Sequence, residues 1–322
     1  MQSLLTYVKN AFRYIGIEIK RWNFVREYAD PQILQKARLT IERYREIVSD
    51  PLNILIERAP QAGYIDKNGY VFLHNGNRVP VFDRLAYYNE FSDFLIINRG
   101  VHEPLEEYCF QEVLKKINST APSMIALGAY WAHYSMWLKK CYPNAICHMV
   151  EPDQKNIEVG KNNFRINGYE DTLLKSFVSN KDFNVDKFLL DFGIDSIDIL
   201  HSDIQGFEVE MLQEAVKSLL KNKIKYIFIS THSEELHRCV VAILKSNNYR
   251  IEVSSGFDLH TTSCDGFVLA SSPQVDSIFP TLTPWADLAF AKQQPLNFLN
   301  QLLMLTNRFP KYIPTKLCTY AG

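Results

Sequence analysis

The chain has 322 residues, of which 47% are hydrophobic, and this is enough to bury one large core with extensions or two separate domains. Its 35 basic and 36 acidic residues leave a net charge of −1, so no basic field is present to attract nucleic acid. No apolar run reaches the ~18 residues of a membrane span, and the mixed first turns do not resemble a signal peptide. The six cysteines include no Cys-x-x-Cys pair, which favours reduced thiols in a cytoplasmic protein.

Two amphipathic helices are predicted at the start of the chain. Residues 3–27 place apolar side chains at helical spacing and basic side chains on the other faces. Asp30 and Pro31 suit the N-cap and the first position of a second helix, which its apolar stripe extends to Val48. We interpret the first helix as docked on its own domain, and peripheral contact with an anionic membrane is the alternative.

A small β unit is predicted over residues 64–82. The sequence Asp66-Lys67-Asn68-Gly69 lies between two β-rich runs, and Asn-Gly supplies the positive φ of a tight hairpin. A second turn, His74-Asn75-Gly76-Asn77, leads into another β-rich run. Residues 103–117 then form a helix that leads into the main domain.

Strands and helices alternate from Ser123 onward. The predicted strands are 124–127, 145–150, 172–178, 197–200, 224–229, 249–253 and 267–270. The predicted helices are 131–140, 153–166, 185–192, 208–220 and 234–245. This α/β alternation predicts a Rossmann-like, seven-stranded, mostly parallel sheet, whose last strand is antiparallel because no helix precedes it. The predicted regions are a helical and β-hairpin extension (1–120), the Rossmann-like domain (121–272) and a tail with a helix near 297–305 (273–322).

Two features at the strand ends predict an adenosyl-binding site, because ligands of open α/β sheets bind beyond the carboxyl ends of the strands. Gly128 and Ala129 begin the turn after the first core strand, where small residues let a ligand approach the backbone. Glu151 ends the next strand, and its carboxylate can accept both ribose hydroxyl protons. The turn lacks Gly-x-Gly-x-x-Gly and so offers no pyrophosphate cradle, which favours S-adenosylmethionine over NAD. The alternative is that the small residues serve only tight strand–helix packing.

Several segments, in this order, resemble the FkbM-type S-adenosylmethionine-dependent methyltransferase family. They are His102-Glu103-Pro104, residues 127–135, Val150-Glu151-Pro152-Asp153 with Asn156 and Asn162-Asn163, residues 198–208, Ser230-Thr231-His232 and Cys264-Asp265-Gly266-Phe267. The similarity spans about residues 100–272. It departs from the family at Ala126, where an acidic residue is usual, at Ala132, where a second glycine is usual, and at Gln205, where glutamate is usual.

The resemblance implies an S-adenosylmethionine site. By it, Gly128, Glu151, Ser179 and Asp203 would line the cofactor, with Val178 near the adenine and Glu103 at the methionine end. The remaining expected cofactor residues are Ala129, Tyr130 and Pro152, with His133 facing the cofactor carboxylate.

Methyl transfer to a hydroxyl needs a group that accepts the proton, either a general base or a metal that lowers the hydroxyl pKa. We predict His232 as the base and Asp203 as the residue that orients it or the substrate, with His201 on the same side by strand parity. Asp265 begins the antiparallel strand at the same sheet edge, and the alternative is a divalent metal held by Asp203, His232 and Asp265. His237 is expected to point away, and each of these groups could instead cap a helix or bind loop backbone.

The expected function is O-methylation of a hydroxyl on a sugar, glycan or related metabolite, where the sugar is implied by the family alone. Two alternatives remain at this point. One is a catalytically weak adenosyl-binding or protein-interaction module, which Ala126 and Ala132 motivate. The other is an NAD-dependent oxidoreductase, which the missing phosphate loop disfavours.

Overall fold

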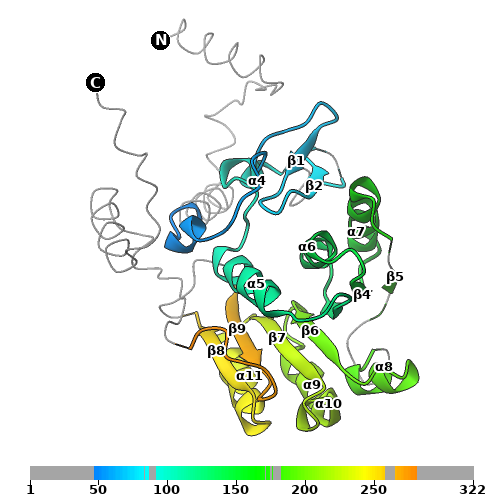
Figure 1. The fold of residues 1–322 in the computed structure, drawn as a ribbon, viewed down its shortest axis with the longest axis vertical. Helices are drawn as coiled ribbons and strands as arrows, with labels where there is room; N and C mark the ends of the chain where they lie inside the picture. The colour runs from blue at the N-terminus through cyan, green and yellow to red at the C-terminus, as the bar shows by residue number, and fades with distance from the viewer. Residues whose placement is uncertain are drawn as a thin grey trace, which may run out of the picture. The chain divides into compact units, whose positions relative to one another are not determined.

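The computed structural model describes residues 47–82, 84–86, 92–170, 172–174, 176, 183–257 and 265–280, all within the compact unit Arg43–Gly322 (Figure 1). The predicted helices over 3–27 and 297–305, and nearly all of the helix over 30–48, lie outside these ranges. Among the described residues, no helix combines the length and the apolarity needed to cross a bilayer.

A seven-stranded sheet with the order β5-β4-β3-β6-β7-β9-β8 forms the centre of the described structure (Figure 1). Its strands are β3 (Ser123–Leu127), β4 (Ile146–Val150), β5 (Thr172–Leu174), β6 (Ile197–Ser202), β7 (Ile224–Thr231), β8 (Arg250–Ser255) and β9 (Gly266–Ser271). Only β9 runs antiparallel to its neighbours β7 and β8. The structure therefore confirms the predicted Rossmann-like sheet and its antiparallel last strand.

Helices cover both faces of this sheet, as the strand pattern requires. Alternate residues of β3 point to opposite sides, so that Met124 and Ala126 join one core cluster while Ile125 and Leu127 join the other. The first cluster contains residues of α5 (Pro104–Lys116), α6 (His133–Cys141) and α7 (Gln154–Asn167). The second contains residues of α8 (Val185–Asp191), α9 (Glu208–Glu214), α10 (Val216–Leu220) and α11 (Glu234–Ser246).

Several boundaries differ from those of the predicted elements. The helix predicted over 208–220 is divided at Ala215 into α9 and α10, because Ala215 departs from helical geometry with φ −97° and ψ 8°. Strands β6 and β7 each extend two residues further, to Ser202 and Thr231. Strand β5 ends at Leu174, and most of the remaining predicted strand lies outside the described residues.

The β unit before the sheet is a hairpin of β1 (Tyr70–Phe72) and β2 (Arg78–Pro80), flanked by the short helices η1 (Pro51–Ile54) and α4 (Asp93–Ile97). The predicted Asn68-Gly69 turn contributes only one bridge, between Ile65 and Val71, whereas the second predicted turn joins the two paired strands. Asn167 of α7 holds this hairpin, since it accepts from the N–H of Arg78 and donates to its carbonyl, both at 2.8 Å.

Candidate active site

A cavity of about 180 Å³ lies at the carboxyl ends of β3 and β6, where the strand order reverses and ligands of such sheets bind. Its lining comes from the turn after β3, from His201, Asp203 and Gln205 at the end of β6, from His102, Glu103 and Glu106 at the start of α5, and from Asp265. The predicted residues Glu103, Gly128, Ala129, Tyr130, His133, His201, Asp203 and Asp265 are thus brought together around one cavity.

Gly128 is required by the chain itself at this cavity. Its φ is +72°, and a Cβ atom there would lie 1.8 Å from the carbonyl oxygen of Asp203. The Asp203 N–H also donates to the carbonyl of Leu127 at 2.9 Å, so the chain after β6 crosses directly over the turn. The atoms that approach Gly128 closely are therefore those of Asp203, and the expected approach of a ligand to this turn stays a prediction.

Two further residues of the turn have left-handed backbone angles, Tyr130 with φ +41° and Ala132 with φ +63°. Ala132 occupies the position where the FkbM-type family usually has glycine. An L-residue in this region costs roughly 1–2 kcal/mol, which explains why glycine suits the position. In this chain the turn holds an alanine in that left-handed conformation.

Glu151 ends β4 beside this turn and is only 4% exposed. Its Oε2 accepts from the N–H of Tyr130 at 3.0 Å, while its Oε1 accepts from the N–H of Asp153 at 3.0 Å and from Nδ2 of Asn156 at 3.2 Å. A carboxylate offers about four acceptor positions, so one remains for a ribose hydroxyl. The ribose contact, and the cofactor contacts of Pro152, stay predictions, and Val178 and Ser179 lie outside the described residues.

His232, which follows β7, is the centre of a group that we call the His232 cluster: His232, Asp203, Glu208 and Asp265. The imidazole Nε2 lies 3.2 Å from Oδ1 of Asp203 and 3.6 Å from Oδ1 of Asp265, while Nδ1 pairs with Oε1 of Glu208. Burial lowers the pKa of His232, but its bonds with Asp203 and Glu208 outweigh this and raise the pKa to about 10. The imidazole is therefore protonated at neutral pH and acts as a donor in this arrangement.

Two predicted histidines occupy different environments. Nε2 of His201 lies 2.5 Å from Oε1 of Glu106, whose Oε2 accepts from the hydroxyl of Ser230 at 2.9 Å. Burial raises the pKa of Glu106. His237 instead pairs with the hydroxyls of Thr231 and Ser254, at 3.0 and 2.9 Å, and does not line the cavity, as expected from its position on the helix.

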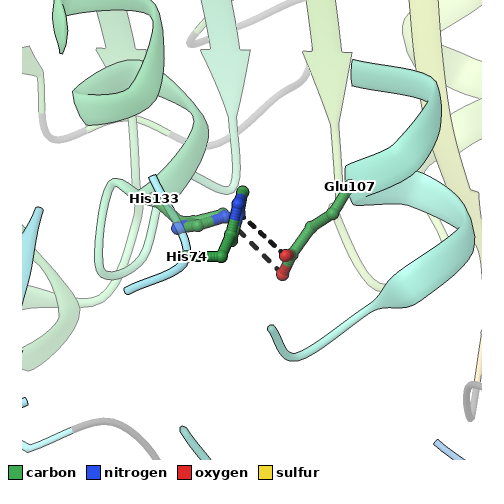
Figure 2. Close-up of side chains that lie close together, drawn as sticks. All are labelled: His74, Glu107 and His133. Atoms are coloured by element: carbon green, nitrogen blue, oxygen red, sulfur yellow. Dashed lines mark ion pairs between the residues drawn. The ribbon is translucent and has the colours of Figure 1, made fainter. Parts of the chain in front are cut away.

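A second group, which we call the Glu107 cluster, consists of Glu107, His74, His102 and His133. The sequence did not predict that these four residues would meet. Oε1 of Glu107 accepts from the N–H of His102 at 2.9 Å and pairs with its Nδ1, while Oε2 lies 2.9 Å from Nε2 of His74. The ring of His133 faces the same carboxylate, with Nε2 at 3.6 Å from Oε1 (Figure 2). Burial raises the pKa of Glu107, but His74 and His102 hold it well below its usual value. The sequence signal was a pair of adjacent glutamates, Glu106 and Glu107, between apolar residues in the first turn of the helix.

Comparison with known proteins gives one family and several remote structures. The family model described as methyltransferase FkbM domain matches residues 101–251. Methyltransferase FkbM from Methylobacillus flagellatus KT is 18% identical, with 55% of this chain and 52% of that chain covered and a TM-score of 0.34. Precorrin-6y C5,15-methyltransferase from Geobacter metallireducens GS-15 is 15% identical, with 51% and 86% covered and a TM-score of 0.38.

The structure of M. capricolum TrmK in complex with S-adenosyl-homocysteine is 16% identical, with 64% of this chain and 88% of that chain covered and a TM-score of 0.34. The curated proteins include no significant match to this sequence. The predicted family resemblance is confirmed by the family model, which residues 101–251 match.

Proposed function

We propose that this protein transfers the methyl group of S-adenosylmethionine to a hydroxyl of a sugar, glycan or related small metabolite. The observation that carries the proposal is the cavity where the strand order reverses, lined by the turn after β3, by Asp203 and by Asp265. The turn and Asp203 lie within the segment that matches the FkbM model, and Asp265 follows that segment. We infer the adenosyl ligand from the match to the FkbM family model. We infer the hydroxyl acceptor from the residues at the cavity that could take up a proton.

The charge of the cavity suits a cationic donor. Four carboxylates line it, from Glu103, Glu106, Asp203 and Asp265, against the imidazoles of His102, His133 and His201, and its described lining includes no lysine or arginine. The pKa of His102 is raised to about 10, so its charge offsets part of this acidic lining. S-adenosylmethionine presents a sulfonium and an ammonium group, whereas a dinucleotide presents phosphates that need donors or positive charge. The same lining therefore supports the methyl donor over NAD.

The cavity is large enough for only one part of S-adenosylmethionine. Small-molecule sites usually measure ~300–1,000 Å³, and the described cavity measures about 180 Å³. We place the methionine half and the methyl group there, and the adenosine across the ends of β4 and β5, beside Glu151 and Pro152.

In the proposed reaction the acceptor oxygen attacks the methyl carbon, the S–CH₃ bond breaks, and the hydroxyl proton passes to Nε2 of His232. A nearby sulfonium charge disfavours the protonated imidazole, so donor binding lowers the pKa of His232 toward that of a general base. Asp203 orients the imidazole at 3.2 Å. A divalent ion held by Asp203, His232 and Asp265 is the alternative way to activate the hydroxyl, and EDTA would then abolish transfer. It has less support, because among the described residues only His74, Glu107 and His133 bring three ligand atoms close enough to share an ion.

A second candidate function is a weak adenosyl-binding module. It is favoured by the left-handed Ala132 and by Glu151, whose carboxylate already accepts three hydrogen bonds within the chain. Calorimetric titration of the full chain with S-adenosylhomocysteine, S-adenosylmethionine and NAD separates the proposals. Binding of both adenosyl compounds, and not of NAD, is expected. Absence of binding at millimolar concentration, or preference for NAD, would overturn the donor site.

A further inference from the structure

Three buried side chains of the Glu107 cluster converge from separate segments. His74 lies in the turn between β1 and β2, Glu107 in the first turn of α5, and His133 at the first position of α6. Their exposed fractions are 1%, 0% and 2%. Figure 2 shows both imidazole rings turned toward the carboxylate. The group is therefore buried, and its members come from three separate segments of the chain.

His74 points one ring nitrogen toward the carboxylate and the other toward the backbone. Its Nδ1 lies 3.4 Å from the carbonyl oxygen of Glu57. Its Nε2 pairs with Oε2 of Glu107 at 2.9 Å, and both atoms are buried. The ring is thus held so that Nε2 lies beside an acidic oxygen, as a metal-binding pair of ligand atoms would.

His133 is less well satisfied than His74, because neither of its buried ring nitrogens has a hydrogen-bond partner. An unsatisfied buried polar group costs about 1–3 kcal/mol, so native proteins rarely retain one without a reason. Its Nε2 lies 3.6 Å from Oε1 of Glu107, beyond hydrogen-bond range. One nitrogen or oxygen from each of the three residues lies within 4.8 Å of the others. Ligand atoms bound at ~2.0–2.2 Å to one ion lie within about 4.4 Å of each other, so a small side-chain adjustment suffices.

We propose that His74, Glu107 and His133 bind a divalent transition-metal ion, for which Zn²⁺ is the first probe. Two imidazoles and one carboxylate form a ligand set that suits Zn²⁺ and Fe²⁺ and leaves a further position open. The carbonyl of Glu57 behind His74 is the kind of second partner that fixes the tautomer of a metal-bound histidine. This site is separate from the His232 cluster and does not depend on the proposed methyl transfer.

The proposed ion joins two parts of the chain. His74 belongs to the hairpin, outside residues 101–251, whereas Glu107 and His133 lie within the FkbM domain. A second cavity of about 510 Å³, lined by His74, Gln111 and Trp137 among others, gives an entry path from the outside. Because His133 directly follows the turn that lines the first cavity, the ion would hold that turn in place.

The test uses the full chain, stripped with a chelator and titrated with Zn²⁺ and Co²⁺. The variants are His133→Gln, His237→Gln as a buried-histidine control, and His232→Gln as a control for the other cluster. One equivalent of metal is expected in the wild type and in both controls, with a tenfold or greater loss of affinity in His133→Gln. Retention of metal by His133→Gln, or its loss in His232→Gln instead, would overturn the assignment.

A wild-type measurement keeps the proposal testable if His133→Gln does not fold. X-ray absorption of the zinc-loaded chain should show two imidazoles and one carboxylate on the ion. Failure of the wild type to bind either metal at micromolar concentration, or a spectrum without two imidazoles, would refute the site. Titration with S-adenosylhomocysteine of the same samples reports separately on the donor site, so that either proposal can fail alone.

Discussion

The His232 cluster and the Glu107 cluster combine the same two residue types in opposite ways. In the first, three carboxylates surround one imidazole, every nitrogen of which has an acidic partner. In the second, Glu107 meets three imidazoles, of which His102 also pairs with Glu103, and both nitrogens of His133 lack a hydrogen-bond partner. His232 holds a proton among its carboxylates, whereas His133 keeps nitrogen atoms that a metal could use. The ratio of carboxylates to imidazoles therefore distinguishes a cluster that holds a proton from one that could hold a metal ion.

The largest expected effect is a difference in the free energy of unfolding between variants of the two clusters. Glu107→Gln should lower the free energy of unfolding by about 3–5 kcal/mol, because it removes the buried charge that balances its histidines. Asp203→Asn, at a side chain 37% exposed, should cost at most about 1 kcal/mol because water screens the exposed pair. Urea denaturation of both variants measures the difference. Equal losses would show that the two clusters are energetically alike.

The next largest effect is expected at Gly128, in the turn after β3. Gly128→Ala should cost about 3 kcal/mol, because it adds a left-handed alanine and a clash with the Asp203 carbonyl. Gly168→Ala is the matched control, since Gly168 has φ +74° and no atom within 4 Å of the added Cβ, and it should cost only about 1 kcal/mol. The readout is the denaturation midpoint at constant slope. Similar losses in both variants would exclude the close approach as the cause.

A smaller effect concerns the ribose carboxylate. Glu151→Ala should weaken S-adenosylhomocysteine binding by about 1–3 kcal/mol, as expected for lost charge-assisted hydrogen bonds. Glu158→Ala, on α7 and 44% exposed, is the control and should leave the affinity unchanged. Calorimetry measures both. An unchanged affinity in Glu151→Ala would remove this carboxylate from the donor site.

The smallest effect separates two histidines by pH. The pKa of His232 is raised to about 10 from 6.5, so its contribution to stability is complete below pH 6.5 and is lost as pH rises toward 10. Burial lowers the pKa of His237, so its contribution is present above pH 6.5 and is lost as pH falls. His232→Gln should therefore reduce the loss of unfolding free energy between pH 7 and 10, and His237→Gln should not. An unaltered alkaline slope in His232→Gln would argue against the protonated imidazole.

The sequence predicted the sheet well because buried parallel strands are short apolar runs that alternate with helices. It also predicted that Asp203, His232 and Asp265 would meet, because topology alone brings strand ends to one edge. It did not predict the Glu107 cluster, since no periodicity relates residues 74, 107 and 133. The division of the helix at Ala215 was missed for a similar reason, because nothing in the local pattern marks the change of backbone angle.

The bonds between Asn167 and Arg78 bear on the choice of the fragment that should be expressed for study. A chain trimmed to residues 101–251 would lose both bonds of Asn167 to the Arg78 backbone and would leave the hydroxyl of Tyr169 without Asn77, 2.7 Å away in the full chain. It would also lack β9, which pairs with six residues of β7. The folding unit is therefore wider at both ends than the segment that family similarity delimits.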